Sequence, residues 1–138
     1  MRSLVLAACL AVVSTVSVAA EPIKVVYHLT EGFQEARRAL GNIRNHLNAD
    51  SEAKIVVVAN GAGIDFLLQD AQSPDGRGFA GPIGELANRG VEFRVCENTL
   101  KGRDMGPDQV VMEATIVPSG VAEAARLQAR ERYAYIKP

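Results

Sequence analysis

Cys96 is the side chain in this sequence with the strongest potential for covalent chemistry, because an ionised thiol is a good nucleophile. The chain has two cysteines, and the other one, Cys9, lies in an apolar N-terminal segment. If that segment is removed, Cys96 has no intramolecular partner. It is then a free thiol, a modified thiol or one half of an intermolecular disulfide.

The reactivity of Cys96 depends on how readily the thiol ionises. We expect backbone N–H groups of a following turn or helix, with Lys101 or Arg103, to lower its pKa, whereas Glu97 acts in the opposite direction. The alternative is a cysteine that packs as a small apolar residue at the end of a strand. An accessible thiol without a function risks oxidation outside the cytosol, which favours a functional role.

Further polar residues follow other segments that are predicted to be strands. In open parallel α/β sheets, ligands gather outside the carboxyl ends of the strands, so these residues are expected to face one rim. The candidate binding residues are His28, Thr30, Asn60, Gly61, Glu97, Asn98, Thr99 and Ser119.

Other kinds of site find less support. His28 either exchanges a proton with the thiol or forms a hydrogen bond at its strand end, and His46 belongs to the flank of a helix. Two histidines and one thiol give no metal-ligand cluster, so no metal is expected. The segment that begins at Gly61 departs from the dinucleotide fingerprint at Phe66, and no cofactor is expected. No serine lies in a nucleophile elbow, and Ser119 is typical of a helix cap.

The charge and length of the chain narrow the possible functions. The 138 residues include 15 Lys and Arg against 16 Asp and Glu, without a basic stripe, so binding to nucleic acid is not expected. Residues 21–138 are enough for one compact domain with its own core.

The first 20 residues have the features of a secretory signal peptide. Arg2 provides a positive start, an uncharged apolar stretch follows, and Val18-Ala19-Ala20 offers the small residues that signal peptidase prefers. The apolar run is shorter than the roughly 20 residues of a membrane span. We expect cleavage after Ala20, a periplasmic or secreted protein, and no stable membrane insertion after cleavage. An uncleaved anchor is the alternative.

Strand and helix patterns alternate along residues 21–138. Aliphatic runs typical of strands covered on both faces flank a stretch in which apolar residues recur at helical spacing. We expect strands over residues 23–29, 54–59, 91–96, 115–117 and 133–136, and helices over residues 33–49, 82–88, 108–114 and 120–131. In the third strand, Glu92, Arg94 and Cys96 share the face that is expected to be less buried. The pattern predicts a three-layer α/β/α sandwich with a mainly parallel five-stranded sheet.

Several of these segments resemble the DsrE/DsrF-like superfamily. They are Val26 to Thr30, Ile55 to Gly61, Gly90 to Leu100, Val117 to Glu123 and Tyr133 to Pro138. The resemblance spans nearly all of the mature chain and implies a parallel α/β/α sandwich that assembles into trimers or hexamers. In the sulfur-relay members DsrE and TusD, a cysteine just after the third strand accepts sulfur as a persulfide. Cys96 falls at the matching position.

Two functions follow as expectations. The first is an exported DsrE-like protein, a sulfurtransferase or sulfur carrier, in which Cys96 takes sulfane sulfur from a donor protein or molecule and passes it to an acceptor. The second is a non-catalytic oligomeric module that binds a small ligand or a protein at the rim, with Cys96 as a structural residue.

Overall fold

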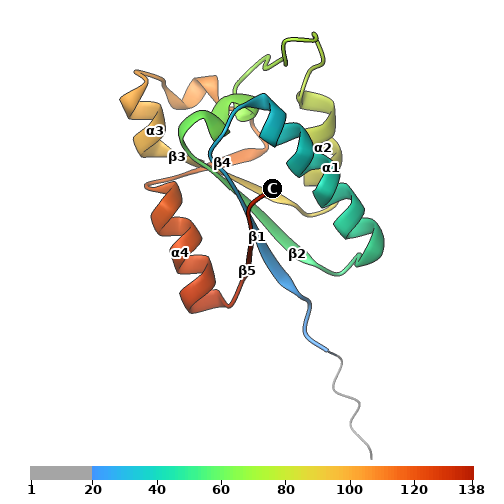
Figure 1. Cartoon of the computed structure of the whole chain (residues 1–138). Helices are drawn as coiled ribbons and strands as arrows, with labels where there is room; N and C mark the ends of the chain where they lie inside the picture. The colour runs from blue at the N-terminus through green and yellow to red at the C-terminus, as the bar shows by residue number, and fades with distance from the viewer. Residues whose placement is uncertain (1–19) are drawn as a thin grey trace, which may run out of the picture.

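A sheet of five parallel strands forms the centre of the protein, for which a computed structural model describes residues 20–138 (Figure 1). The strands are β1 (Lys24–Leu29), β2 (Lys54–Ala59), β3 (Glu92–Cys96), β4 (Ala114–Val117) and β5 (Ala134–Ile136). They pair in the order β4-β3-β2-β1-β5, and every pairing is parallel. The predicted α/β fold with a five-stranded sheet is therefore confirmed.

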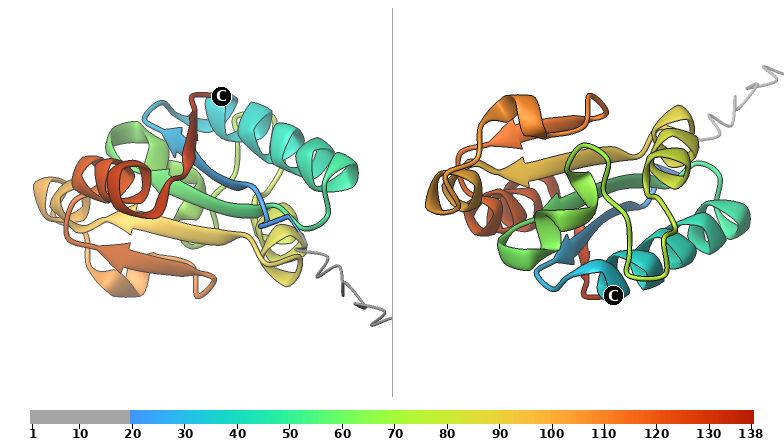
Figure 2. Two further views of the ribbon diagram at one scale, coloured as in Figure 1. Left: turned by 90° about the horizontal axis from the view of Figure 1, so that it is seen from below. Right: turned by 90° about the horizontal axis from the view of Figure 1, so that it is seen from above.

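Helices cover both faces of this sheet, unequally. The helical elements are α1 (Phe33–Ala49), η1 (Gly61–Leu67), α2 (Ala80–Asn88), α3 (Glu97–Gly102), η2 (Pro107–Gln109) and α4 (Gly120–Glu131). The chain moves across the sheet in one direction from β1 to β4 and returns over it to β5. Because parallel crossovers are right-handed, the return helix α4 must lie on the opposite face from α1 and α2. Figure 2 shows α4 in front of the strands in the left view and η1 in front of them in the right view.

The two faces bury cores of different size. On the face of α1 and α2, one continuous cluster includes Phe66, Phe79 and Phe93, whose rings meet edge to face. On the face of α4, the buried cluster comprises Val26, Val56, Val58 and Leu127. Each large apolar side chain stabilises the fold by about 1.5–3 kcal/mol when fully buried. Most of the hydrophobic stabilisation therefore lies on the first face.

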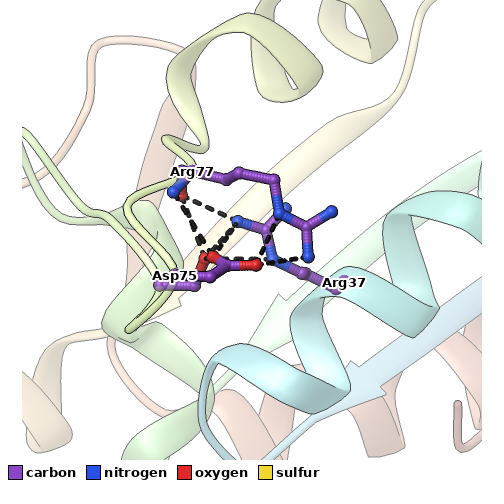
Figure 3. A network of polar contacts seen from close by, with 4 residues as sticks. Arg37, Asp75 and Arg77 are labelled. Carbon is purple, nitrogen blue, oxygen red and sulfur yellow. Dashed lines mark hydrogen bonds and ion pairs between the residues drawn. The ribbon is translucent and has the colours of Figure 1, made fainter.

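The polar loop before α2 is fastened to α1 by a network of side chains (Figure 3). The guanidinium of Arg37 donates to the carbonyl of Arg77 at 2.7 Å and to the hydroxyl of Ser73, and it lies over the ring of Phe79. Hydrogen bonds from Arg77 and then from Ser73 hold the pKa of the Asp75 carboxyl well below its usual value. The network fixes the turn-rich segment that leads to the buried Phe79 and to α2.

The structure corrects three details of the sequence interpretation. Residues 110–114 are not helical, because the backbone there pairs with the end of η1 and the residue after it: Val110 forms a bridge with Leu68, and the N–H of Val111 donates to the carbonyl of Leu67 at 2.9 Å. Of the expected helix, only Asp108 and Gln109 are helical, in the short η2. The short helix α3 is not among the expected helices, although a turn or helix was expected to follow Cys96. Strand β4 is not buried, since it forms the edge of the sheet and its residues are half-buried or exposed.

The N-terminal segment is outside this description. The expected signal peptide falls on residues 1–19, which precede the described range, and on Ala20. Among residues 20–138, no helix has the length and apolar character required to cross a membrane.

Gly63 supports a stability prediction, because η1 crosses the end of β1 at this residue. A β-carbon on Gly63 would lie 2.2 Å from the carbonyl oxygen of Leu29, so Gly63→Ala forces two backbone segments apart. We expect the free energy of unfolding to fall by about 3 kcal/mol, as measured by urea denaturation. Gly41→Ala, in open space within α1, is the control and should stabilise the protein by about 1 kcal/mol. Equal stability of Gly63→Ala and the wild type would contradict the close approach.

Candidate functional site

Cys96 ends β3 and is the residue from which α3 begins. Its neighbour across the sheet is Val117, the last residue of β4, after which α4 begins at Gly120. The two helices leave in different directions, because Leu100 of α3 joins the larger core and Leu127 of α4 joins the smaller one. Cys96 thus lies where the chain diverges to the two faces of the sheet, the position at which this kind of fold binds ligands.

Gly120 brings α4 into direct contact with the cysteine. A β-carbon on Gly120 would lie 3.2 Å from the β-carbon of Cys96 and 3.1 Å from that of Asn60. Only a glycine leaves α4 this close to both side chains without displacing one of them. The side chain of Ser119 caps the same helix by accepting from the N–H of Ala122 at 3.4 Å.

The surroundings of Cys96 favour the thiolate. Burial, with only 5 % of the residue exposed, raises the pKa of the thiol, but four donors outweigh this effect and bring the pKa below its usual value. These donors are the backbone N–H of Gly120, the hydroxyl and backbone N–H of Thr99, and the backbone N–H of Asn98. The N–H dipoles of Asn98 and Thr99 belong to the first turn of α3, and they stabilise the sulfur most once it is charged.

The hydroxyl of Thr99 links Cys96 to the loop after β2. Its oxygen accepts a hydrogen bond from the backbone N–H of Gly61 at 3.0 Å. That bond occupies a lone pair of the hydroxyl and leaves its proton available for the sulfur of Cys96. Gly61 has a φ of 56°, in the left-handed region, which explains why a glycine stands at this turn.

Charged neighbours are not the main source of the lowered pKa of Cys96, contrary to expectation. Lys101 forms an ion pair with Glu97 at 3.1 Å, and Arg103 forms one with Asp65 at 2.6 Å. The largest contributions that lower the pKa of the thiol come from uncharged donors. Glu92, Arg94 and Cys96 share the less buried face of β3, as expected, since Glu92 is exposed and Arg94 is half-buried, but Cys96 itself is buried at the end of the strand.

His28 joins the site through Asn60 and not through the thiol. Its Nε2 lies 2.6 Å from Oδ1 of Asn60, and its Nδ1 lies 2.8 Å from the hydroxyl of Tyr135 in β5. Since the amide oxygen can only accept, Nε2 of His28 donates to it, and in that tautomer Nδ1 accepts from Tyr135. Both ring nitrogens are engaged, so the structure favours the hydrogen-bonding role of His28. His46 accompanies Tyr27 instead, at 3.0 Å from its hydroxyl.

Thr30 belongs to a separate ion-pair cluster on the same rim. The buried carboxylate of Glu35 accepts from the backbone N–H groups of Thr30 and Glu31 at 2.8 and 2.6 Å, and it pairs with Lys137. Burial raises the pKa of Glu35, but Lys137 and the two N–H groups lower it by more, so the net pKa lies below the usual value. Lys137 also donates to the hydroxyl of Thr30 at 2.9 Å, so the C-terminal segment fixes the β1–α1 loop.

The candidate residues therefore fall into three groups. Around the sulfur of Cys96 the structure places Asn60, Gly61, Asn98, Thr99 and, through its helix, Ser119. His28 is one hydrogen bond further away, whereas Thr30 and Glu97 are engaged in their own polar contacts.

Sequence reasoning missed three residues of this rim. They are Gly120, Tyr135 and Glu35. The signal at Gly120 was its place directly after a helix cap, and the signal at Glu35 was a carboxylate in the first turn of a helix. Tyr135 gave no signal, because its partner is 107 positions away in the sequence.

A hollow elsewhere on the surface is lined by the carboxylates Asp70 and Glu113 but by no thiol, hydroxyl or imidazole. It has a volume of about 420 Å³ and lies between the segment after η1 and the residues that precede β4, with the exposed side chain of Met112 on its edge. Residues 20–138 contain no cluster of three or more histidine, cysteine or acidic side chains that could hold a metal ion. The chemistry-bearing groups of the described chain are those at the rim.

The fold and the site together define a class of protein, namely a parallel α/β domain with a thiol at the end of β3. A family model described as the DsrE/DsrF-like family matches residues 24–138, so the chain belongs to this family, which is related to sulfur-relay proteins. A comparison with curated proteins gives no significant match.

Solved structures agree with this assignment. A protein of unknown function, MTH1491 from Methanobacterium thermoautotrophicum, is 32% identical with a TM-score of 0.76, and the match covers 84% of this chain and 99% of that one. The ychN protein from E. coli is 12% identical with a TM-score of 0.64, over 85% of this chain and 100% of that one. At this low identity the second likeness concerns the fold alone.

Thr99→Val tests the origin of the thiol's acidity. Valine keeps the shape of threonine but cannot donate to the sulfur, so we expect the pKa of Cys96 to rise. The rate of alkylation by iodoacetamide, followed against pH, should reach half its maximum at a higher pH than in the wild type. Thr115→Val, on an exposed residue of β4, is the matched control and should leave the profile unchanged. An unshifted profile for Thr99→Val would exclude the hydroxyl as a source of thiolate stabilisation.

Proposed function

We propose that this protein accepts sulfane sulfur on Cys96 as a persulfide and passes it to an acceptor thiol. The observation that carries the proposal is the set of uncharged donors that converge on the sulfur and lower the pKa of the thiol. Membership of a family related to sulfur-relay proteins supports it. The proposed role is that of a sulfur carrier or sulfurtransferase.

The chemistry needs no cofactor. The Cys96 thiolate attacks the sulfane sulfur of a donor such as thiosulfate, a new S–S bond forms, and the S–S bond of thiosulfate breaks. Sulfite leaves with the electron pair of the broken bond, and Cys96 carries the persulfide anion. An acceptor thiolate then attacks the outer sulfur, takes it as its own persulfide and returns Cys96 as a thiolate. No external oxidant or reductant enters this cycle.

Uncharged donors suit the sulfur of Cys96, because this atom is negatively charged as a thiolate and loses the charge when the persulfide forms. A lysine paired with the thiolate would hold the charge on the cysteine sulfur, whereas N–H and O–H dipoles from Gly120, Asn98 and Thr99 surround the region without adding a charge. The same dipoles can stabilise the leaving thiolate when the persulfide is transferred. This arrangement favours exchange in both directions.

The burial of Cys96 favours a second candidate function. With 5 % of its surface exposed, the residue also fits a structural cysteine in a non-catalytic module that binds a ligand or partner at the rim. The two candidates differ in one property, which is the reactivity of Cys96 in the folded protein.

The proposed location of the protein is the periplasm or the outside of the cell. The N-terminal pattern that ends at Ala20 supports export and cleavage. In such a compartment the persulfide must be transferred before it is oxidised, so the proposal includes a donor and an acceptor in the same compartment.

Mass spectrometry of the intact protein tests the proposed function. Protein from its native compartment, reduced and then incubated with thiosulfate or polysulfide, should gain about 32 Da, the mass of one sulfur atom, on Cys96. The mass should also show a chain that begins at Glu21. Cys96→Ser is the control and should gain nothing. If the folded wild type takes up no sulfur from any donor and resists alkylation, the structural cysteine is the correct alternative.

A homo-oligomer, a trimer or a hexamer, is the proposed assembly state. Within residues 20–138, α4 is the helix on its face of the sheet, and it covers only part of that face (Figure 2, left). The exposed apolar residues include Val121 at the start of α4 and Tyr135 in β5. A second copy of the chain would shield this surface.

Light scattering tests the proposed assembly. At micromolar concentration the mass should be three or six times that of the mature chain. Val121→Glu places a charge on the exposed side of α4 and should shift the distribution towards the monomer. Lys101→Glu, on the exposed surface of α3, is the control. A monomer mass for the wild type at all concentrations would refute the assembly.

A further inference from the structure

Asn60, which directly follows β2, is held by hydrogen bonds to both its backbone and its side chain. Its backbone N–H donates to the carbonyl of Leu29 at 3.1 Å, and its carbonyl accepts from the N–H of Gly63 at 3.0 Å. Its side-chain oxygen accepts from Nε2 of His28 at 2.6 Å. Backbone and side chain are therefore both held in place.

A hydrogen-bonded chain links the amide of Asn60 to β5, on the far side of β1. The hydroxyl of Tyr135 lies 2.8 Å from Nδ1 of His28, and the two rings meet edge to face with centroids 5.6 Å apart. Because the Asn60 oxygen that faces Nε2 can only accept, Nε2 carries the proton, and the hydroxyl of Tyr135 supports this tautomer by donating to Nδ1. The amide nitrogen is consequently turned away from His28.

The amide nitrogen of Asn60 is an available donor. Hydrogen bonds in the described part of the chain engage the side-chain oxygen of Asn60 but not its nitrogen. Among the same residues no buried side-chain nitrogen or oxygen lacks a partner, so this nitrogen reaches the surface. Two N–H bonds are thus free to meet a molecule that arrives from solvent.

Asn60 lies close to Cys96. Gly120 approaches the β-carbons of both residues, and Gly61, the residue after Asn60, is bonded to Thr99. Asn60 and Cys96 are therefore neighbours at the start of α4. A negatively charged group that approaches Cys96 from solvent meets the oriented amide donor of Asn60. No carboxylate is hydrogen-bonded to that donor.

We propose that Asn60, aligned by His28 and Tyr135, is a positioning residue that binds the anionic end of a small sulfur donor while Cys96 attacks its sulfane sulfur. The inference rests on the proposed function and specifies its substrate class, which is a small oxoanion such as thiosulfate. His28 and Tyr135 act through Asn60 and touch neither the thiol nor the substrate.

Two alkylating reagents of similar size separate this role from a structural one. Iodoacetate carries the negative charge of the proposed substrate, and iodoacetamide is neutral. The ratio of their second-order rate constants with folded protein reports the attraction of an anion to the site, independently of the nucleophilicity of Cys96. A merely structural role of Asn60 would change both rates together and leave the ratio intact.

We expect Asn60→Ala to lower the iodoacetate to iodoacetamide ratio about tenfold, because a hydrogen bond to a charged group is lost. Tyr135→Phe removes one oxygen atom from a half-exposed side chain and retains the fold, and it should lower the ratio about threefold. Tyr133→Phe, two residues earlier and outside the hydrogen-bonded chain, is the matched control and should keep the wild-type ratio.

The outcomes separate the two proposals. If wild-type Cys96 reacts but Asn60→Ala and Tyr135→Phe keep the wild-type ratio, the positioning role is overturned and the proposed function stands. If wild-type Cys96 reacts with neither reagent in the folded state, the proposed function itself fails. A lowered ratio in both variants, with that of Tyr133→Phe unchanged, supports the positioning role.

Discussion

The close approach of α4 to the end of β3 is the contact on which the rest of the candidate site depends. Gly120 has no side chain, so the first turn of α4 lies against the β-carbons of Cys96 and Asn60. This approach brings a backbone N–H of one helix to a sulfur that the short helix α3 already meets from the other side. A side chain at position 120 would crowd the β-carbons of Cys96 and Asn60 and push α4 away from them.

The path of the chain explains why this contact forms at the ends of β3 and β4. Four strands are laid down in one direction across the sheet, and the chain then returns over the opposite face to add β5 beside β1. The segments after β3 and β4 therefore leave on different faces, and the space between them opens at Cys96. The return also places Tyr135 next to His28, so that one crossover supplies both Gly120 and the last member of the hydrogen-bonded chain.

The lowered pKa of the Cys96 thiol shows that oriented uncharged donors can stabilise a thiolate in place of a neighbouring cation. Desolvation is the largest single influence on the Cys96 thiol and opposes ionisation, yet several modest dipoles aimed at one atom outweigh it. The nearby cations are engaged elsewhere, with Lys101 bound to Glu97 and Arg103 bound to Asp65. Charge proximity along the sequence was therefore a poor guide to the electrostatics of the site.

The sequence by itself determined the order of the strands and main helices and the rim on which the polar residues lie. Hydrophobic periodicity is local, and α1 and β2 begin and end where it predicted. Local patterns also indicated Cys96, Asn60 and Thr99, because the carboxyl ends of parallel strands share an edge. The helix expected over residues 108–114 did not form beyond Gln109, because the backbone there is hydrogen-bonded to Leu67 and Gln69, which are distant in the sequence.

Only the tertiary structure decided what each rim residue does. Gly120, Tyr135 and Glu35 became important through partners far away in the sequence, and the burial of Cys96 depends on a helix that crosses the sheet before β5. Hydrogen-bond partners and desolvation are properties of three-dimensional packing and leave no periodic trace in the sequence. For that reason the sequence could locate the thiol, while its acidity and its neighbours emerged only from the fold.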